Sequence, residues 1–205
     1  MGGRGSHSSS YSTVRKTPTF ESLDVKSTKE FDTLPDDTKT TVLASIDRMY
    51  SELPKLRGEI AYVDFYERPK RKIKASNAGE LAHVKPYGDK SNVTLLEGFK
   101  DTKRLNARVS SDKSGVNGQD VKSVLYHEIG HAAVNRIRRN TGNPSIETSI
   151  VNKASSHGKA SDISRYATRN NNETIGEAVS DYMTHGSKAN PMSISIWKQL
   201  KSYLS

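Results

Sequence analysis

The chain has 205 residues, of which 32 are Lys or Arg and 23 are Asp or Glu, so its formal net charge is +9. This length suits one catalytic domain with a tail and is too short for two full-sized domains. The chain has no cysteine, which excludes disulfide scaffolds, thiolate zinc sites, iron–sulfur clusters and thiol nucleophiles. Any metal must therefore be held by His, Asp or Glu. No apolar run approaches the about 20 residues of a membrane span, and the N-terminus lacks a signal-peptide stretch, so we expect neither membrane association nor Sec export.

Residues 1–30 are rich in Gly, Ser, Thr and Lys, and they predict a flexible basic arm in front of a folded domain at 31–205. The first element expected in the domain is a helix from about Leu34 to Leu53. Pro35 suits the first turn of this helix, and Pro54 ends it. Its apolar residues recur at helical spacing, so one side should pack on a core.

Three runs with strand composition come next, and they predict a small sheet: Ile60–Tyr66, Asn92–Leu96 and Leu105–Ser110. We expect Leu105–Ser110 to be the edge strand, to which an extended substrate can add through backbone hydrogen bonds. The run Leu81–Val84 fits either a strand or a helix. The basic cluster Arg68–Lys74 has the charge to contact nucleic acid, but no aromatic residues interleave with it, which favours a solvated loop.

The second half of the chain predicts three helices and a polar loop. A long helix capped by Asn117 should run to about Arg139, and a Ser- and Lys-rich loop should span Thr141–Ser164. A further helix should follow Asn172. An amphipathic helix should cover Ser193–Leu204.

The central motif is His127-Glu128-Ile129-Gly130-His131, which lies inside the expected long helix. The i, i+4 spacing places both imidazoles on one face, about one turn apart, which is the arrangement for binding one Zn²⁺ ion. The adjacent carboxylate of Glu128 can then accept a proton from a water molecule whose pKa the metal lowers to about 7. Water would be the nucleophile, so the chemistry needs neither Ser nor Cys.

A catalytic zinc site requires a third protein ligand. The metzincin continuation of the motif is absent, because Val134 replaces its Gly and Ile137 replaces its third His. The next helix supplies Glu173, Glu177 and Asp181 at successive i, i+4 positions. Two assignments remain open. Either Glu173 binds the metal and Glu177 accepts the N–H of a ligand histidine, or Glu177 binds the metal and Asp181 supports it.

Two resemblances bear on this choice. The segment Glu177–Asp181 resembles the thermolysin-type Glu-Ala-x-Ser-Asp segment, which favours the second assignment. The longer run Ser164–Ala178 resembles the C-terminal peptidase domain of anthrax lethal factor, in which a Tyr lies seven residues before the ligand Glu and a second Glu four residues after it. This resemblance implies that Glu173 is the third ligand and that Glu177 supports a ligand without binding the metal itself. It also implies that the phenol of Tyr166 stabilises the developing oxyanion.

A further resemblance concerns the origin of the chain. The opening Met1–Ser6, the run Val121–Tyr126 and the ending Gly186–Ser193 are similar to phage-encoded zincin domains, as found among phage head-morphogenesis and minor head proteins. It implies a phage or prophage source, a location in the bacterial host cytoplasm or the virion, and phage structural proteins as partners. The family commonly has two aromatic residues after the ligand Glu, where this chain has Thr174 and Ile175.

Two other residues stand out. Gly176 lies in the middle of the expected ligand helix, where glycine costs about 1 kcal/mol relative to alanine. His157 is an alternative metal ligand, although a polar loop is a poor place to hold a metal donor in position.

These patterns predict an α+β, zincin-like zinc metalloendopeptidase with a small twisted sheet, an HExxH helix and a C-terminal helix that carries the third ligand. Its cofactor would be Zn²⁺ and its substrate a protein or peptide. The alternative function is a basic virion or nucleic-acid-associated protein with a vestigial zincin fold, for which the charge of +9 and Arg68–Lys74 argue.

Overall fold

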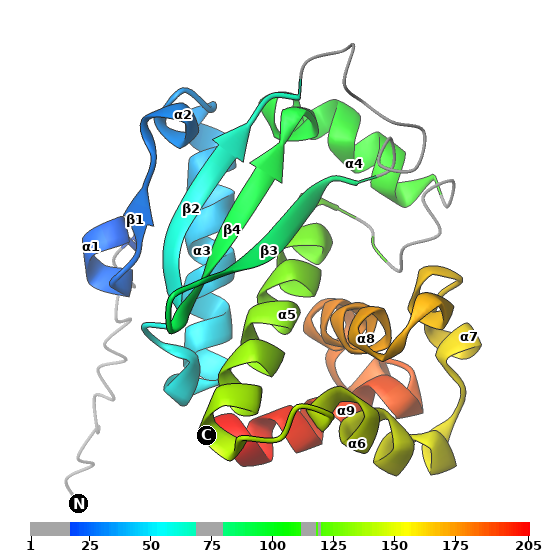
Figure 1. Cartoon of the computed structure of the whole chain (residues 1–205). Helices are drawn as coiled ribbons and strands as arrows, with labels where there is room; N and C mark the ends of the chain where they lie inside the picture. Colours follow the sequence, from blue (N-terminus) through cyan, green and yellow to red (C-terminus); the bar gives the residue numbers. More distant parts are fainter. Residues whose placement is uncertain (1–16, 69–79, 112–117, 119) are drawn as a thin grey trace, which may run out of the picture.

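The fold is α+β and is built around a mixed four-stranded sheet of order β1-β2-β4-β3 (Figure 1). The computed structural model describes residues 17–68, 80–111, 118 and 120–205. The strands β1 and β4 run parallel to β2, whereas β3 is antiparallel to β4. The bounds of the strands are β1 Lys26–Ser27, β2 Ile60–Tyr66, β3 Ala82–Tyr87 and β4 Lys90–Leu96.

The helices α3 and α5 lie behind the sheet in Figure 1, and α8, α9 and α6 extend the domain beyond α5. A hydrophobic core runs from the inner face of the sheet through α3 and α5 to Trp197 of α9. The helices are α1 Phe20–Leu23, α2 Lys29–Asp32, α3 Asp36–Glu52, α4 Thr102–Ser110, α5 Val121–Thr141, α6 Ile146–Ala154, α7 Ala160–Ile163, α8 Asn171–His185 and α9 Pro191–Leu204. Within the described parts of the chain, none of these helices combines the length and apolarity needed to cross a membrane.

Several elements predicted from the sequence are confirmed. The helix α3 begins after Pro35 and ends before Pro54, and it buries Val42, Ile46 and Met49 at helical spacing. The strands β2 and β4 include the two predicted runs. The helices α8 and α9 also form where expected, and the first residue of α9 is Pro191.

The predicted edge strand Leu105–Ser110 is wrong, because these residues belong to helix α4. Leu105 and Val109 are its buried side chains, and their spacing of four residues matches one turn of a helix. Asp101 caps this helix by accepting a hydrogen bond from the backbone N–H of Arg104 at 3.0 Å. The edges of the sheet are formed by β1 and β3 instead.

The strand β3 resolves the ambiguous run Leu81–Val84, and it continues through Pro86 to Tyr87. It forms a hairpin with β4 around the two-residue loop Gly88-Asp89, in which Gly88 has a φ of 59°. A Gly-Asp pair between two strands is a known hairpin signal, so the sequence did contain evidence for β3.

Part of the expected arm is folded onto the domain. Residues 17–30 include α1, β1 and the start of α2, and they bury Leu23 and Val25 in the core. Thr28 anchors this segment by donating a hydrogen bond from its hydroxyl to the carboxylate of Asp64 at 2.6 Å. Residues 1–16 of the expected arm lie outside the described residues.

The region around the long helix also differs from expectation. Asn117 lies outside the described residues, and the cap of α5 is Asp120. The expected polar loop Thr141–Ser164 contains the helices α6 and α7, because Ile146 and Ile150 supply a short apolar stripe among its polar residues. The basic cluster is described only at Arg68, which pairs with Glu97 and Glu80, so its predicted role stays untested beyond that residue.

Candidate metal centre

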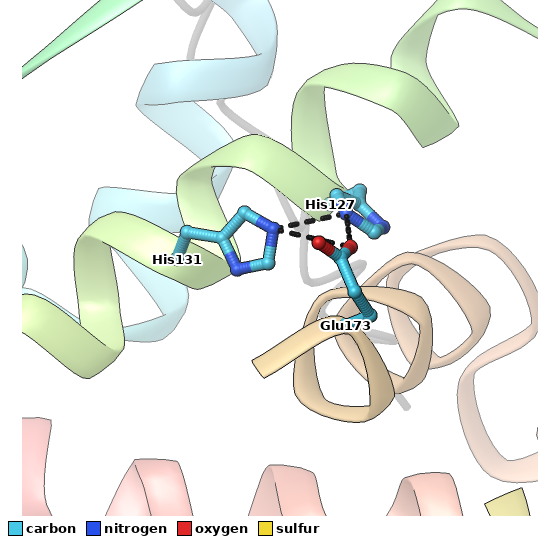
Figure 2. Close-up of side chains that lie close together, drawn as sticks. All are labelled: His127, His131 and Glu173. Atoms are coloured by element: carbon cyan, nitrogen blue, oxygen red, sulfur yellow. Dashed lines mark hydrogen bonds and ion pairs between the residues drawn. The ribbon is translucent and has the colours of Figure 1, made fainter. Parts of the chain in front are cut away.

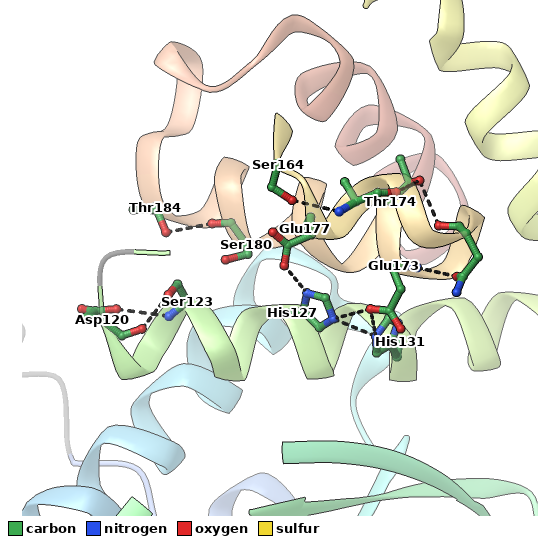
Figure 3. A network of polar contacts seen from close by, with 12 residues as sticks. Asp120, Ser123, His127, His131, Ser164, Glu173, Thr174, Glu177, Ser180 and Thr184 are labelled. Atoms are coloured by element: carbon green, nitrogen blue, oxygen red, sulfur yellow. Dashed lines mark hydrogen bonds and ion pairs between the residues drawn. The ribbon is translucent and has the colours of Figure 1, made fainter. Parts of the chain in front are cut away.

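The helix α5 places His127 and His131 on one face. Its N-terminus is fixed by Asp120, whose carboxylate accepts hydrogen bonds from the backbone N–H groups of Lys122 and Ser123 at 3.0 and 3.1 Å. The two imidazole rings lie one turn apart with their centroids at 4.6 Å. Both rings face α8 (Figure 3).

The helix α8 presents Glu173 in its first turn. Asn170 caps this helix and accepts a hydrogen bond from the backbone N–H of Glu173 at 2.9 Å. A carboxylate at this end of a helix is favoured by the helix dipole. The hydroxyl of Thr174 donates to the carbonyl of Ala167 at 2.8 Å, which ties α8 to the preceding 3₁₀ turn η6 (Tyr166–Arg169).

Glu173, His127 and His131 converge between the two helices (Figure 2). One possible ligand atom from each residue lies within 4.8 Å of those of the other two. Oε2 of Glu173 is 3.0 Å from Nε2 of His127 and 3.7 Å from Nε2 of His131, and the two Nε2 atoms are 3.0 Å apart. Tetrahedral zinc bonds of about 2.0–2.1 Å place two ligand atoms about 3.3 Å apart. The two nitrogens and one carboxylate oxygen therefore fit a zinc ion in both chemistry and spacing.

Glu177 and Asp181 have different surroundings from Glu173. Nδ1 of His127 donates a hydrogen bond to Oε1 of the fully buried Glu177 at 2.7 Å, on the opposite side of the ring from Glu173. Asp181 lies a turn further along α8, where it pairs with His185 at 2.7 Å and accepts from the backbone N–H of Asn190 at 2.8 Å. This arrangement corresponds to the assignment in which Glu173 binds the metal and Glu177 accepts the N–H of a ligand histidine.

His127 and Glu173 shift each other's pKa in opposite directions. Burial by itself lowers the pKa of His127, but hydrogen bonds to Glu173 and Glu177 outweigh it and raise that pKa to about 10. Burial raises the pKa of Glu173, and hydrogen bonds from His127 and His131 reverse this, so that its pKa lies well below its ordinary value.

Glu128 is buried beside the two histidines. Burial raises its pKa above the ordinary value of 4.5, while the positive charges of His127 and His131 oppose this rise. The side chain belongs to the same helix as both histidines, so its position relative to them is fixed by the turn of α5.

Tyr166 lies next to the site, in the 3₁₀ turn that leads into α8. Its ring centroid is 5.8 Å from that of His127, and the guanidinium of Arg169 lies 4.2 Å from its centroid on the ring face. Partial burial raises the pKa of the Tyr166 phenol, which keeps its hydroxyl protonated and able to donate. The alternative ligand His157 belongs to the exposed turn after α6 and is not part of the described group.

No protein-family model and no curated protein sequence matches the chain. Among solved structures, the chain is similar to the crystal structure described as "a putative zinc-binding metallo-peptidase from Bacteroides caccae". The sequence identity is 16% and the TM-score is 0.42, and the match covers 88% of this chain and 78% of that chain.

Gly176 is a further residue of the site, and its role there is not evident from the sequence alone. Gly176 lies between Glu173 and Glu177 on α8, and its backbone is packed against both imidazole rings. The available signal was its poor helix propensity, since glycine in a helix interior requires a compensating reason.

Proposed function

We propose that the chain is a zinc-dependent metalloendopeptidase that hydrolyses peptide bonds in protein or peptide substrates. The observation that carries this proposal is the convergence of the ligand atoms of His127, His131 and Glu173, with Glu128 on the same helix as the two histidines. A site that combines three such ligands with a neighbouring carboxylate has the residues that metal-assisted hydrolysis needs.

The residues would divide the chemistry as follows. His127, His131 and Glu173 would hold the zinc ion, and Glu177 would keep the ring of His127 in one orientation and tautomer. When bound, zinc is a Lewis acid that polarises a carbonyl group and lowers the pKa of water. The carboxylate of Glu128 would accept a proton from the attacking water and return it to the leaving amine. The hydroxyl of Tyr166 would donate to the oxygen that gains negative charge.

The edge strand β3 offers a place for an extended substrate. The backbone N–H of Leu96 donates to the carbonyl of Leu81 at 3.0 Å, so Leu81 and Leu96 form a hydrogen-bonded pair at the end of the β3–β4 pair of strands. Because bonded and non-bonded pairs alternate in antiparallel strands, the backbone groups of Ala82 and Val84 point away from β4. This edge is on the side of the sheet toward α8, so a peptide added there would run past the site (Figure 1).

The metal and the chemistry can be tested separately. We expect purified protein to hold about one zinc ion per chain by elemental analysis, and to lose it when His131 or Glu173 is replaced by Ala. Glu128→Gln should keep the zinc and lose cleavage of a peptide library, by at least about 100-fold. Absence of zinc from the reconstituted wild type, or cleavage that survives Glu128→Gln, would contradict the proposal.

The same variant separates this proposal from the alternative of a basic nucleic-acid-associated protein. Binding to nucleic acid would be indifferent to Glu128→Gln and would weaken steeply with salt. A phage or prophage source, with phage structural proteins as partners, is supported by the sequence resemblance alone.

A further inference from the structure

Gly176 is in the interior of α8, one residue before the buried Glu177. Its φ is not in the positive range, so its backbone conformation does not require glycine. Since alanine is favoured over glycine in a helix interior, the sequence gives up local helix stability at this position. The surroundings of the residue provide the reason.

A side chain at this position would collide with both candidate metal ligands. A Cβ atom built on Gly176 would lie 2.8 Å from Cε1 and 2.9 Å from Nε2 of His127, and 2.9 Å from Cε1 of His131. Carbon atoms in optimal contact are about 3.5–4.0 Å apart, so the rings would have to move. Both rings would be displaced together, because one atom touches both.

The ring of His127 is held at both of its nitrogens. Its Cε1 atom lies between Nδ1, which is held by Glu177 at 2.7 Å, and Nε2, which is held by Glu173 at 3.0 Å. These two carboxylates come from the same helix as Gly176, three residues before it and one residue after it. Glu173 and Glu177 therefore hold the imidazole from its two nitrogens (Figure 3), and Gly176 lies against the Cε1 edge between them.

We propose that Gly176 is a positioning residue of the metal site, whose missing side chain lets both imidazoles lie against the backbone of α8 and aim their Nε2 atoms at Glu173. This inference rests on the proposed zinc site. It makes the size of residue 176, and not only the identity of the ligands, a determinant of metal affinity.

The first test compares zinc affinity in two glycine variants. Gly176→Ala should lower the affinity at least about tenfold, as changes next to metal ligands commonly do. Gly130→Ala is the matched control, because it adds a methyl group at the same crossing of α5 and α8, where the new atom would meet Val179 atoms at 3.2 Å and the Cα of Gly176 at 3.5 Å but neither ring. We expect it to have a much smaller effect. Competition with a chromogenic chelator measures both affinities, and the visible spectrum of the Co²⁺-substituted proteins reports ligand geometry.

The second test needs no metal. In metal-free protein, Gly176→Ala should lower the midpoint of thermal unfolding, because the methyl group strikes the rings. In a His127→Ala/His131→Ala background the rings are absent, and the same substitution should raise the midpoint or leave it unchanged, because alanine favours the helix. If Gly176→Ala alone does not fold, folding of the triple variant still reports the contact.

The outcomes separate the two proposals. Unchanged zinc affinity and equal thermal shifts in both backgrounds would overturn the role of Gly176 and leave the zinc site standing. A wild-type protein that does not bind zinc would overturn both. A change in the Co²⁺ spectrum with Gly176→Ala, absent with Gly130→Ala, would support a role in ligand positioning over a general packing effect.

Discussion

At the scale of single residues, three carboxylates on one helix have different roles that their chemistry alone does not distinguish. Glu173 faces the Nε2 atoms of both histidines, and Glu177 accepts a hydrogen bond from Nδ1 of His127. Asp181 holds His185 and the backbone N–H of Asn190, and so joins the end of α8 to the start of α9.

Alanine substitutions at Glu177 and Asp181 should separate these roles. Both remove a buried carboxylate from α8, and both should lower the free energy of unfolding. Glu177→Ala should also lower zinc affinity about 10- to 100-fold, because it frees the ring of His127, whereas Asp181→Ala should leave zinc affinity nearly unchanged. Zinc titration of the two proteins checks this. A larger loss of affinity with Asp181→Ala would point to the second assignment, in which Glu177 binds the metal.

At the scale of elements, the orientation of α5 is fixed by a polar contact to the sheet as well as by the core. The fully buried Glu59, just before β2, pairs with Arg139 near the end of α5 and accepts a hydrogen bond from Ser91 of β4 at 2.7 Å. Asn135, one turn beyond His131, donates to the hydroxyl of Ser91 at 3.3 Å. The helix that carries the histidines is thus tied to β4 and to the residue that leads into β2.

Arg139→Leu should therefore destabilise the protein by about 3 kcal/mol, because it leaves the carboxylate of Glu59 buried without its partner. We expect the lower end of the range for buried pairs, since Arg139 keeps 31% of its side chain exposed. Lys201→Leu is the control, because it breaks an exposed pair with Glu52 that should contribute less than about 1 kcal/mol. Urea unfolding of the metal-free proteins measures both, and equal effects would contradict a special role for Glu59.

At the scale of the whole molecule, the candidate ligands join two helices that belong to one hydrophobic core. Residues of α5 and α8 pack in the same cluster as residues of the sheet, α3 and α9. A ligand that binds the folded state alone stabilises the entire cooperative unit. Zinc binding should for this reason be visible as global stability and not only as local order.

Free zinc at 100 times its dissociation constant should stabilise the folded protein by about 2.7 kcal/mol. For a chain of this size, that corresponds to a rise of about 5–10 °C in the midpoint of thermal unfolding, reversed by a chelator. Scanning calorimetry measures the shift. Glu128→Gln should retain it and His131→Ala should lose it, so a shift that persists in His131→Ala would show that zinc binds elsewhere.

Local sequence patterns were sufficient to predict some of the elements. The helices α3, α8 and α9 were predictable because proline, asparagine and apolar spacing define them within a few residues. The strand β3 stayed ambiguous because Pro86 interrupts its strand pattern, although the Gly-Asp pair after it is a hairpin signal. The helix α4 was predicted as a strand because the short run around Leu105 fits two periodicities. The start of α5 was predicted three residues too early, because Asn117 and Asp120 are both suitable helix caps and Asp120 is the one used.

The sequence by itself determined that two histidines share one face of a helix, with a glutamate directly after the first of them, because the i, i+4 spacing acts within about one turn. It also limited the third ligand to a few carboxylates on one later helix. Only the tertiary structure decided which carboxylate faces which nitrogen, that Gly176 lies against both imidazole rings, and that β3 forms the edge toward α8. These features depend on how closely α5 and α8 cross, and the residues that meet there, such as His127 and Glu173, are 46 positions apart in the chain. Packing of the whole core sets that distance, and no local pattern encodes it.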